Sequence, residues 1–256
     1  MVSIAAPLRD HVVSMPEAEP VAKPDIHLKV EGLHAHYGES HILHGIDFEV
    51  RRGECVCLLG RNGAGRTTTL RAILGLVDKR EGAITLDAED VVTWPAHKIA
   101  RLGVGYCPEE RGIYSTLTCE ENLKLPPAVG EGGMSVDDIY AMFPNLRERK
   151  KSQGTRLSGG EQQMLAISRI LRTGAHLLLL DEISEGLAPV IVQKLGEVIA
   201  ELRAKGYTIV LAEQNFRFAA PLADRVYVIE HGRVVLEVAR ADLRAQAATI
   251  KDYLGV

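Results

Sequence analysis

The stretch LLGRNGAGRTTTL, residues 58–70, places two spaced glycines between an apolar strand and a threonine-rich helix start. This order is typical of a phosphate-binding loop with the pattern G-x-x-x-x-G-K-[ST], but Arg66 occupies the position of the lysine. Gly60 and Gly65 allow backbone turns that a Cβ would obstruct, so that successive N–H groups can point at phosphate oxygens. Thr67 stands where a hydroxyl would coordinate Mg²⁺. Taken alone, the stretch fits either a phosphate loop or an ordinary structural turn.

Two carboxylates follow another predicted strand. The segment LLLLDE, residues 177–182, places four leucines before Asp181 and Glu182. Ligands of open α/β sheets bind at the carboxyl ends of the strands, so Asp181 would hold Mg²⁺ through a water molecule there. Glu182 would polarise an attacking water as general base. The alternative is a strand followed by an acidic helix cap.

A third motif, LSGGEQQ at residues 157–163, opens a long predicted helix. Ser158 fits the N-cap position, and the two glycines allow close approach to free N–H groups at the positive end of the helix dipole. A lone Ser-Gly-Gly before a helix is often only a cap. Two anion-binding helix starts in one chain nevertheless suggest a nucleotide sandwiched between two subunits.

The alternation of apolar and helical segments predicts the fold class. ECVCLLG is a central buried strand that enters the loop, TTTLRAILGL is the helix that follows it, and TIVLAEQ is a later strand. This order predicts a mostly parallel α/β sheet covered by helices. Strand-like pieces at 26–30, 34–37 and 47–50 add a small N-terminal β element.

The chain of 256 residues is expected to form one large domain with an insertion. Short helical patterns broken by PP, GEGG and FPN predict a helical subdomain over about residues 95–155. Residues 1–24 are rich in Pro, Ala and Glu and are expected to be a mobile tail before a domain at 25–256.

Composition and charge disfavour several classes of protein. A formal net charge of −4 lacks the basic footprint of a nucleic-acid binder. No apolar run approaches the roughly 18 residues of a membrane-spanning helix, and the N-terminus lacks the features of a signal peptide, so we expect a cytoplasmic protein. Without a C-x-x-C spacing, zinc is not expected, and Cys55 and Cys57 should pack on one side of their strand. We interpret four neighbouring histidines as surface residues rather than a metal site: His34, His36, His41 and His44.

In their order and spacing the three motifs resemble those of the ATP-binding subunits of ABC transporters. GRNGAGRTT is similar to the Walker A loop, LLLLDE to Walker B and LSGGEQQ to the family signature, over about residues 25–235. The resemblance implies a P-loop NTPase fold with a RecA-like core, and ATP and Mg²⁺ as ligands. YCPEERGIYSTLTCEENL, EGLAPVIV and EQNFRFA are similar to the smaller ATPase subunit of branched-chain amino-acid uptake systems. Importers of urea or short-chain amides use similar subunits, so this alternative stays open.

The resemblance also implies roles for individual residues. Tyr37 falls at the aromatic position that stacks on adenine, and Glu109 and Gln214 stand where many members have a glutamine and a γ-phosphate-sensing histidine. Glutamine can donate a hydrogen bond but cannot be protonated. The implied catalytic residues are Glu182, Gln214 and Glu109, and the implied metal ligands are Thr67, Asp181 and Glu109. The implied nucleotide-binding residues are Tyr37, Gly60, Arg61, Asn62, Gly63, Ala64, Gly65, Arg66, Thr67, Thr68, Ser158, Gly159, Gly160 and Glu161.

Arg66 is the main departure from the family pattern. Arginine keeps the positive charge, but its planar fork is wider and more directional than the lysine ammonium. If the charged group at this position is misplaced by an ångström relative to the phosphates, the rate of the chemical step falls on the order of 10²-fold. We therefore expect weakened ATP hydrolysis. Two interpretations follow: an energy-coupling ATPase, or a degenerate subunit whose signature serves a partner's site.

The partners follow from the same resemblance. It implies a second ATPase subunit, identical or different, and integral membrane permeases that contact the segment around Arg111 to Leu123. A periplasmic solute-binding protein would take part indirectly, and no nucleic acid is expected. The chain would then lie peripherally on the cytoplasmic face of the inner membrane.

Overall fold

The computed structural model describes residues 25–255, so the tail predicted at 1–24 lies outside the described residues. The strands are β1 (Ile26–Tyr37), β2 (Ser40–Arg51), β3 (Cys55–Leu59), β4 (Lys79–Leu86), β5 (Glu89–Asp90), β6 (Val104–Cys107), β7 (Leu177–Asp181), β8 (Thr208–Glu213), β9 (Arg225–Glu230) and β10 (Arg233–Ala239). The α-helices are α1 (Arg66–Ile73), α2 (Ala96–Ala100), α3 (Cys119–Lys124), α4 (Val136–Met142), α5 (Pro144–Glu148), α6 (Gly159–Leu171), α7 (Pro189–Ala204), α8 (Phe216–Ala219) and α9 (Ala247–Leu254). Two short 3₁₀ helices are η1 (Gly154–Arg156) and η2 (Arg240–Asp242).

Within residues 25–255 the strands form two sheets, and the larger confirms the predicted α/β core. Its order is β10-β9-β3-β8-β7-β6, and every pair is parallel except β10 with β9. Helices cover both faces, which is why β3 and β7 are continuous buried apolar runs. Successive residues of β3 face opposite cores, with Cys55 and Cys57 unbridged on the same side, as predicted.

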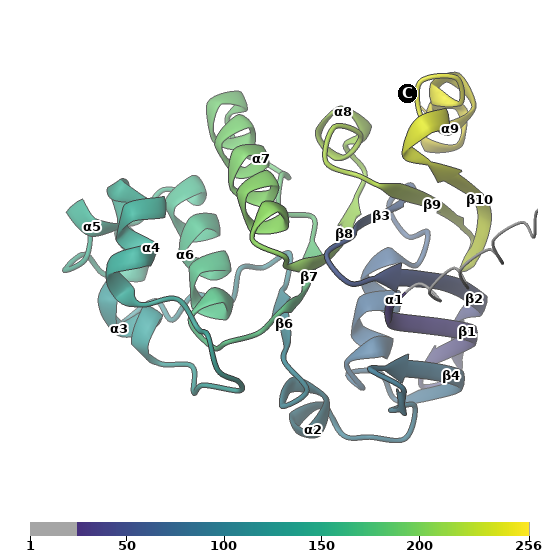
Figure 1. The fold of residues 1–256 in the computed structure, drawn as a ribbon, viewed down its shortest axis with the longest axis horizontal. Coiled ribbons are helices and arrows are strands. Elements are labelled where there is room, and N and C mark those ends of the chain that lie inside the picture. The colour runs from purple at the N-terminus through teal and green to yellow at the C-terminus, as the bar shows by residue number, and fades with distance from the viewer. Residues whose placement is uncertain (1–24, 256) are drawn as a thin grey trace, which may run out of the picture.

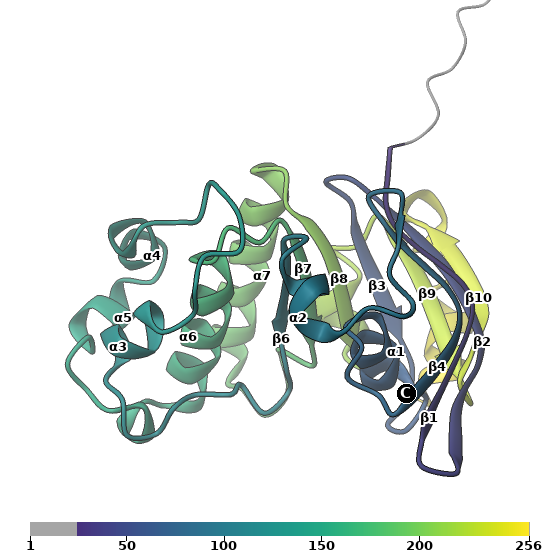
Figure 2. The same cartoon turned by 90° about the horizontal axis from the view of Figure 1, so that it is seen from below.

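The smaller sheet is antiparallel, in the order β2-β1-β4-β5. The two pieces predicted at 26–30 and 34–37 are in fact one strand, β1, whose pairing is irregular between Val30 and Leu33. Gly32 lies in this irregularity with φ 54°, which interrupts the period-two pattern in the sequence. Helix α1 packs between the two sheets, with contacts to β1 and β2 on one side and to β7 and β8 on the other (Figure 2).

Helices α3 to α6 form a lobe beside the larger sheet (Figure 1). Strand β6 lies within the span of about 95–155 predicted for this subdomain, but it pairs in parallel with β7 inside the larger sheet. A four-residue strand flanked by glycine is too short to give a clear strand pattern. We propose that the helical subdomain begins after Cys107. Among the helices described, none combines the length and the apolar character needed to cross a membrane.

Candidate nucleotide site

The loop between β3 and α1 has the backbone of an anion-binding turn. Gly63 and Gly65 take φ values of 77° and 113°, which favour glycine. A Cβ on Gly60 would lie 2.4 Å from the carbonyl oxygen of Ile229, so the loop also needs glycine for close packing. The first N–H groups of α1, beginning at Arg66, have no acceptor inside the helix and are available to an anion.

Arg66 points into the loop and is only 3% exposed. Its Nη1 donates to the Gly60 carbonyl at 2.6 Å, and its Nη2 donates to Asn62 Oδ1 at 3.3 Å and to Glu182 Oε1 at 2.6 Å. The fork of the guanidinium therefore spans the loop and the carboxylate at the end of β7. A lysine ammonium could not form this bridge from two nitrogens at once.

A hydroxyl and a carboxylate meet at the edge of the larger sheet. Thr67 Oγ1 donates to Asp181 Oδ1 at 3.0 Å, and Tyr106 Oη donates to Asp181 Oδ2 at 3.1 Å. Burial raises the pKa of Asp181, while both hydrogen bonds lower it. Tyr106 was missed by the sequence analysis, because its strand β6 was assigned to the helical subdomain.

Glu182 follows β7 in the left-handed region, at φ 48°, a conformation that costs on the order of 1 kcal/mol or more for a residue with a side chain. Burial and a hydrogen bond with Glu185 raise the pKa of Glu182 to about 7, against the opposing charge of Arg66. Carboxylate oxygens of Glu109, Glu182 and Glu185 lie within 4.8 Å of one another. The structure thus brings Glu109 to the site and adds Glu185, which the sequence analysis did not single out.

Arg66, Thr67 and Glu182 border one cavity of about 270 Å³. It is lined by Tyr37, Ile42, residues 63–68 and Glu182. Free N–H groups, a buried guanidinium and a hydroxyl paired with a carboxylate suit phosphate oxygens and a hard cation such as Mg²⁺. The residues present therefore fit a magnesium nucleotide. Gln214, directly after β8, is exposed and lies outside this lining.

The signature motif lies elsewhere, at the start of α6. Ser158 caps the helix as predicted: Glu161 N–H donates to Ser158 Oγ at 3.3 Å, and Ser158 N–H donates to the Glu161 carboxylate at 2.7 Å. Gly160 is needed for packing, because a Cβ would lie 2.9 Å from Ile191. Helices α6 and α1 stand apart in both views (Figures 1 and 2). One chain therefore does not bring the signature residues at the start of α6 to its own phosphate loop before α1. These residues are Ser158, Gly159, Gly160 and Glu161.

Comparisons with known proteins agree with this geometry. The profile of the ABC transporter family matches residues 43–185. The chain is 40% identical to the high-affinity branched-chain amino acid transport ATP-binding protein BraG of Pseudomonas aeruginosa, over 89% of this chain and 99% of BraG. It is 30% identical to the lipopolysaccharide export system ATP-binding protein LptB of Haemophilus influenzae, over 89% of this chain and 97% of LptB. A solved ATP-binding subunit of an ABC transporter superposes with a TM-score of 0.74 at 30% identity, covering 90% of this chain and 99% of that one. The chain therefore belongs to the ABC transporter family and is one of its ATPase cassettes.

Proposed function

We propose that this ATPase binds ATP with Mg²⁺ in the cavity beside α1 and hydrolyses it slowly to energise transport of branched-chain amino acids. One observation supports the site above all others. Arg66 and Thr67 from the loop after β3 line a single cavity together with the Glu182 carboxylate after β7, and the Thr67 hydroxyl donates to Asp181 at 3.0 Å.

Each residue has a proposed task. The loop N–H groups and Arg66 would bind phosphate oxygens, and Tyr37, which lines the same cavity, would stack on the base. Thr67 and Asp181, joined at 3.0 Å, would hold Mg²⁺, with Glu109 nearby. When bound, Mg²⁺ neutralises charge on the phosphates. Glu182 would accept the proton of the attacking water, a role suited to a carboxyl whose pKa is raised to about 7.

The pairing of Arg66 with Glu182 supports slow hydrolysis. The 2.6 Å contact ties the proposed base to the guanidinium that should contact phosphate. Glu182 must weaken this hydrogen bond before it can hold a water molecule. The same contact favours the second candidate function, a degenerate subunit that binds ATP and contributes its signature helix to a partner's site.

The proposed assembly is a dimer of ATPase subunits beneath two membrane permeases, at the cytoplasmic face of the inner membrane. Because the signature and the loop stand apart in one chain, a second subunit would supply the signature opposite this loop. The likeness to BraG, a branched-chain amino acid transport protein, supports branched-chain amino acids as the solute, acquired through a periplasmic binding protein. The likeness to LptB is weaker, and urea or short-chain amides remain the alternative solutes.

The test of the site compares the native chain with Glu182→Gln, both assayed for ATP binding and for phosphate release in Mg²⁺. Glu201→Gln, an exposed position in α7, is the matched control. We expect ATP binding in all three proteins and turnover in the native chain and the control only. Turnover that persists in Glu182→Gln would refute the assigned base, and absence of ATP binding would refute the site.

The test of the solute is uptake into vesicles that hold the chain with its permeases and binding protein. ATP-dependent uptake of leucine without uptake of urea is the expected result. Urea uptake alone would overturn the proposed solute without affecting the assigned site.

A further inference from the structure

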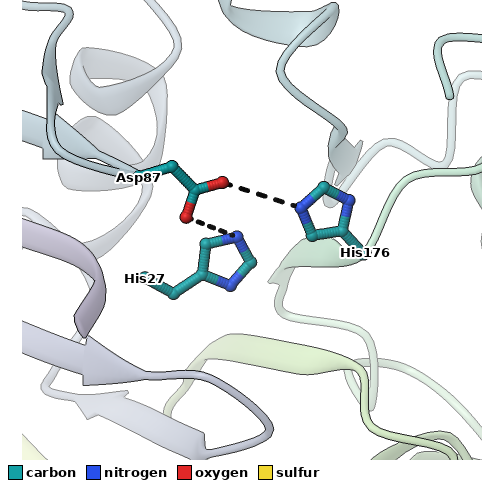
Figure 3. A group of neighbouring side chains, drawn as sticks. All are labelled: His27, Asp87 and His176. Atoms are coloured by element: carbon teal, nitrogen blue, oxygen red, sulfur yellow. Dashed lines mark ion pairs between the residues drawn. The ribbon is translucent and has the colours of Figure 1, made fainter. Parts of the chain in front are cut away.

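Two histidines and an aspartate from distant parts of the chain meet near the amino end of β7 (Figure 3). The nucleotide site lies at the other end of this strand. His27 lies in β1, Asp87 lies in the turn after β4, and His176 directly precedes β7, whose other end holds Asp181. His27 Nε2 lies 3.7 Å from Asp87 Oδ1, and His176 Nε2 lies 4.0 Å from Asp87 Oδ2. All three donor atoms lie within 4.8 Å of one another. No step assigned to the nucleotide site uses these residues.

His27 is held in the orientation that a metal ligand needs. The residue is 2% exposed, and its Nδ1 lies 2.8 Å from Thr208 Oγ1, which also accepts the Gly53 N–H at 3.0 Å. The hydroxyl thus fixes one ring nitrogen and leaves Nε2 facing Asp87. Such an outer partner is the usual support of a metal-binding histidine.

Asp87 and His176 are partly exposed to solvent, so their side chains can change position when an ion binds. Asp87 is 34% exposed and His176 is 46% exposed, and the rings of His27 and His176 stack with centroids 4.9 Å apart. Arg52 occupies part of the site, because its guanidinium pairs with Asp87 Oδ1 and with Asp25 Oδ2. A metal ion must therefore displace Arg52 from Asp87.

We propose that His27, Asp87 and His176 bind a divalent transition-metal ion of the Zn²⁺ type, with water as the fourth ligand. Two imidazoles and one carboxylate are a common donor set for such ions. Bonds of about 2.0 to 2.1 Å to a tetrahedral ion place donors about 3.3 Å apart. The observed separations of 3.7 and 4.0 Å are longer than this value, and the rings of His27 and His176 are stacked with 6° between their planes. The exposed His176 ring must therefore turn so that its nitrogen faces the same ion as His27 Nε2.

The bound ion would join the two sheets, because His27 and Asp87 belong to the antiparallel sheet and its turn while His176 adjoins the parallel sheet. An ion that binds only the folded chain stabilises it. The histidines of the β1–β2 hairpin are a rival location, with His34 Nδ1 and His41 Nε2 3.0 Å apart. Within residues 25–255, however, the groups of three or more mutually close donors are the present one and the acidic group at Glu182.

The test is calorimetric titration of the untagged full chain with Zn²⁺, for the native protein and three variants. We expect one ion per native chain, about tenfold or more weaker binding in His176→Ala, and tighter binding in Arg52→Ala, where the competing cation is gone. His41→Ala, the control for the hairpin histidines, should bind as the native chain does. Zn²⁺ should also raise the thermal midpoint of the native chain but not that of His176→Ala. Absence of native binding, unchanged affinity in His176→Ala, or loss of binding in His41→Ala would overturn the proposal.

Discussion

Replacing Arg66 by lysine should raise ATP turnover, because it releases Glu182. In the native chain Arg66 Nη2 donates to Glu182 Oε1 at 2.6 Å, a charge-assisted hydrogen bond between groups that are 3% and 11% exposed. Such a bond contributes about 1.5 to 3 kcal/mol, and about 1.4 kcal/mol corresponds to a factor of ten in rate. Lysine keeps the charge but cannot bridge Gly60, Asn62 and Glu182 together. Since part of the pairing can persist, we expect kcat to rise about 10- to 100-fold.

The assay is steady-state phosphate release at saturating ATP and Mg²⁺, with ATP affinity measured separately. Arg101→Lys, an exposed arginine after α2, is the matched control and should leave both quantities unchanged. ATP affinity of Arg66→Lys should change by less than about tenfold, because both side chains bind phosphate. Adding Glu182→Gln to Arg66→Lys should abolish the gain. If Arg66→Lys binds ATP but turns over no faster than the native chain, the hydrogen bond to Glu182 does not limit hydrolysis.

Substitutions at three further residues test the surroundings of the loop. Tyr37→Ala should weaken ATP binding by about 1 to 3 kcal/mol, while Tyr37→Phe should retain it; equal affinities for both would contradict stacking on the base. Tyr106→Phe removes the hydrogen bond to Asp181 and should raise the Mg²⁺ concentration needed for ATP binding about tenfold, whereas an unchanged Mg²⁺ titration would exclude this support. Gly60→Ala places a Cβ 2.4 Å from the Ile229 carbonyl and should cost about 1 to 3 kcal/mol in the free energy of urea unfolding; native stability would show that the loop can relax.

Much of the fold could be predicted because the central strands of the larger sheet are short, largely apolar and alternate with helices. β3 and β7 are buried on both faces, and this leaves continuous apolar runs in the sequence. β6 has only four residues and is flanked by glycine, so its pairing with β7 was not predictable from pattern alone. The irregularity at Gly32 likewise divided one strand into two predicted pieces.

The site was predictable where spacing along the chain determines it. Thr67 and Asp181 belong to motifs whose place beside a strand end follows from the sequence, and the structure brings them to 3.0 Å. The bond between Arg66 and Glu182 joins residues 116 positions apart, so the sequence shows a cation but not its partner. Tyr106 was missed because β6 was assigned to the helical subdomain, so its contact with Asp181 at the edge of the larger sheet could not be expected.

The most direct test of the central claim is a crystal structure of the full chain with a non-hydrolysable ATP analogue and Mg²⁺. We expect the triphosphate against the backbone N–H groups of residues 63–68, the metal ion beside Thr67 and Asp181, and Arg66 still hydrogen-bonded to Glu182. An analogue bound away from this loop would contradict the assigned site. An Arg66 side chain turned fully onto phosphate, with Glu182 free, would contradict the explanation for slow hydrolysis.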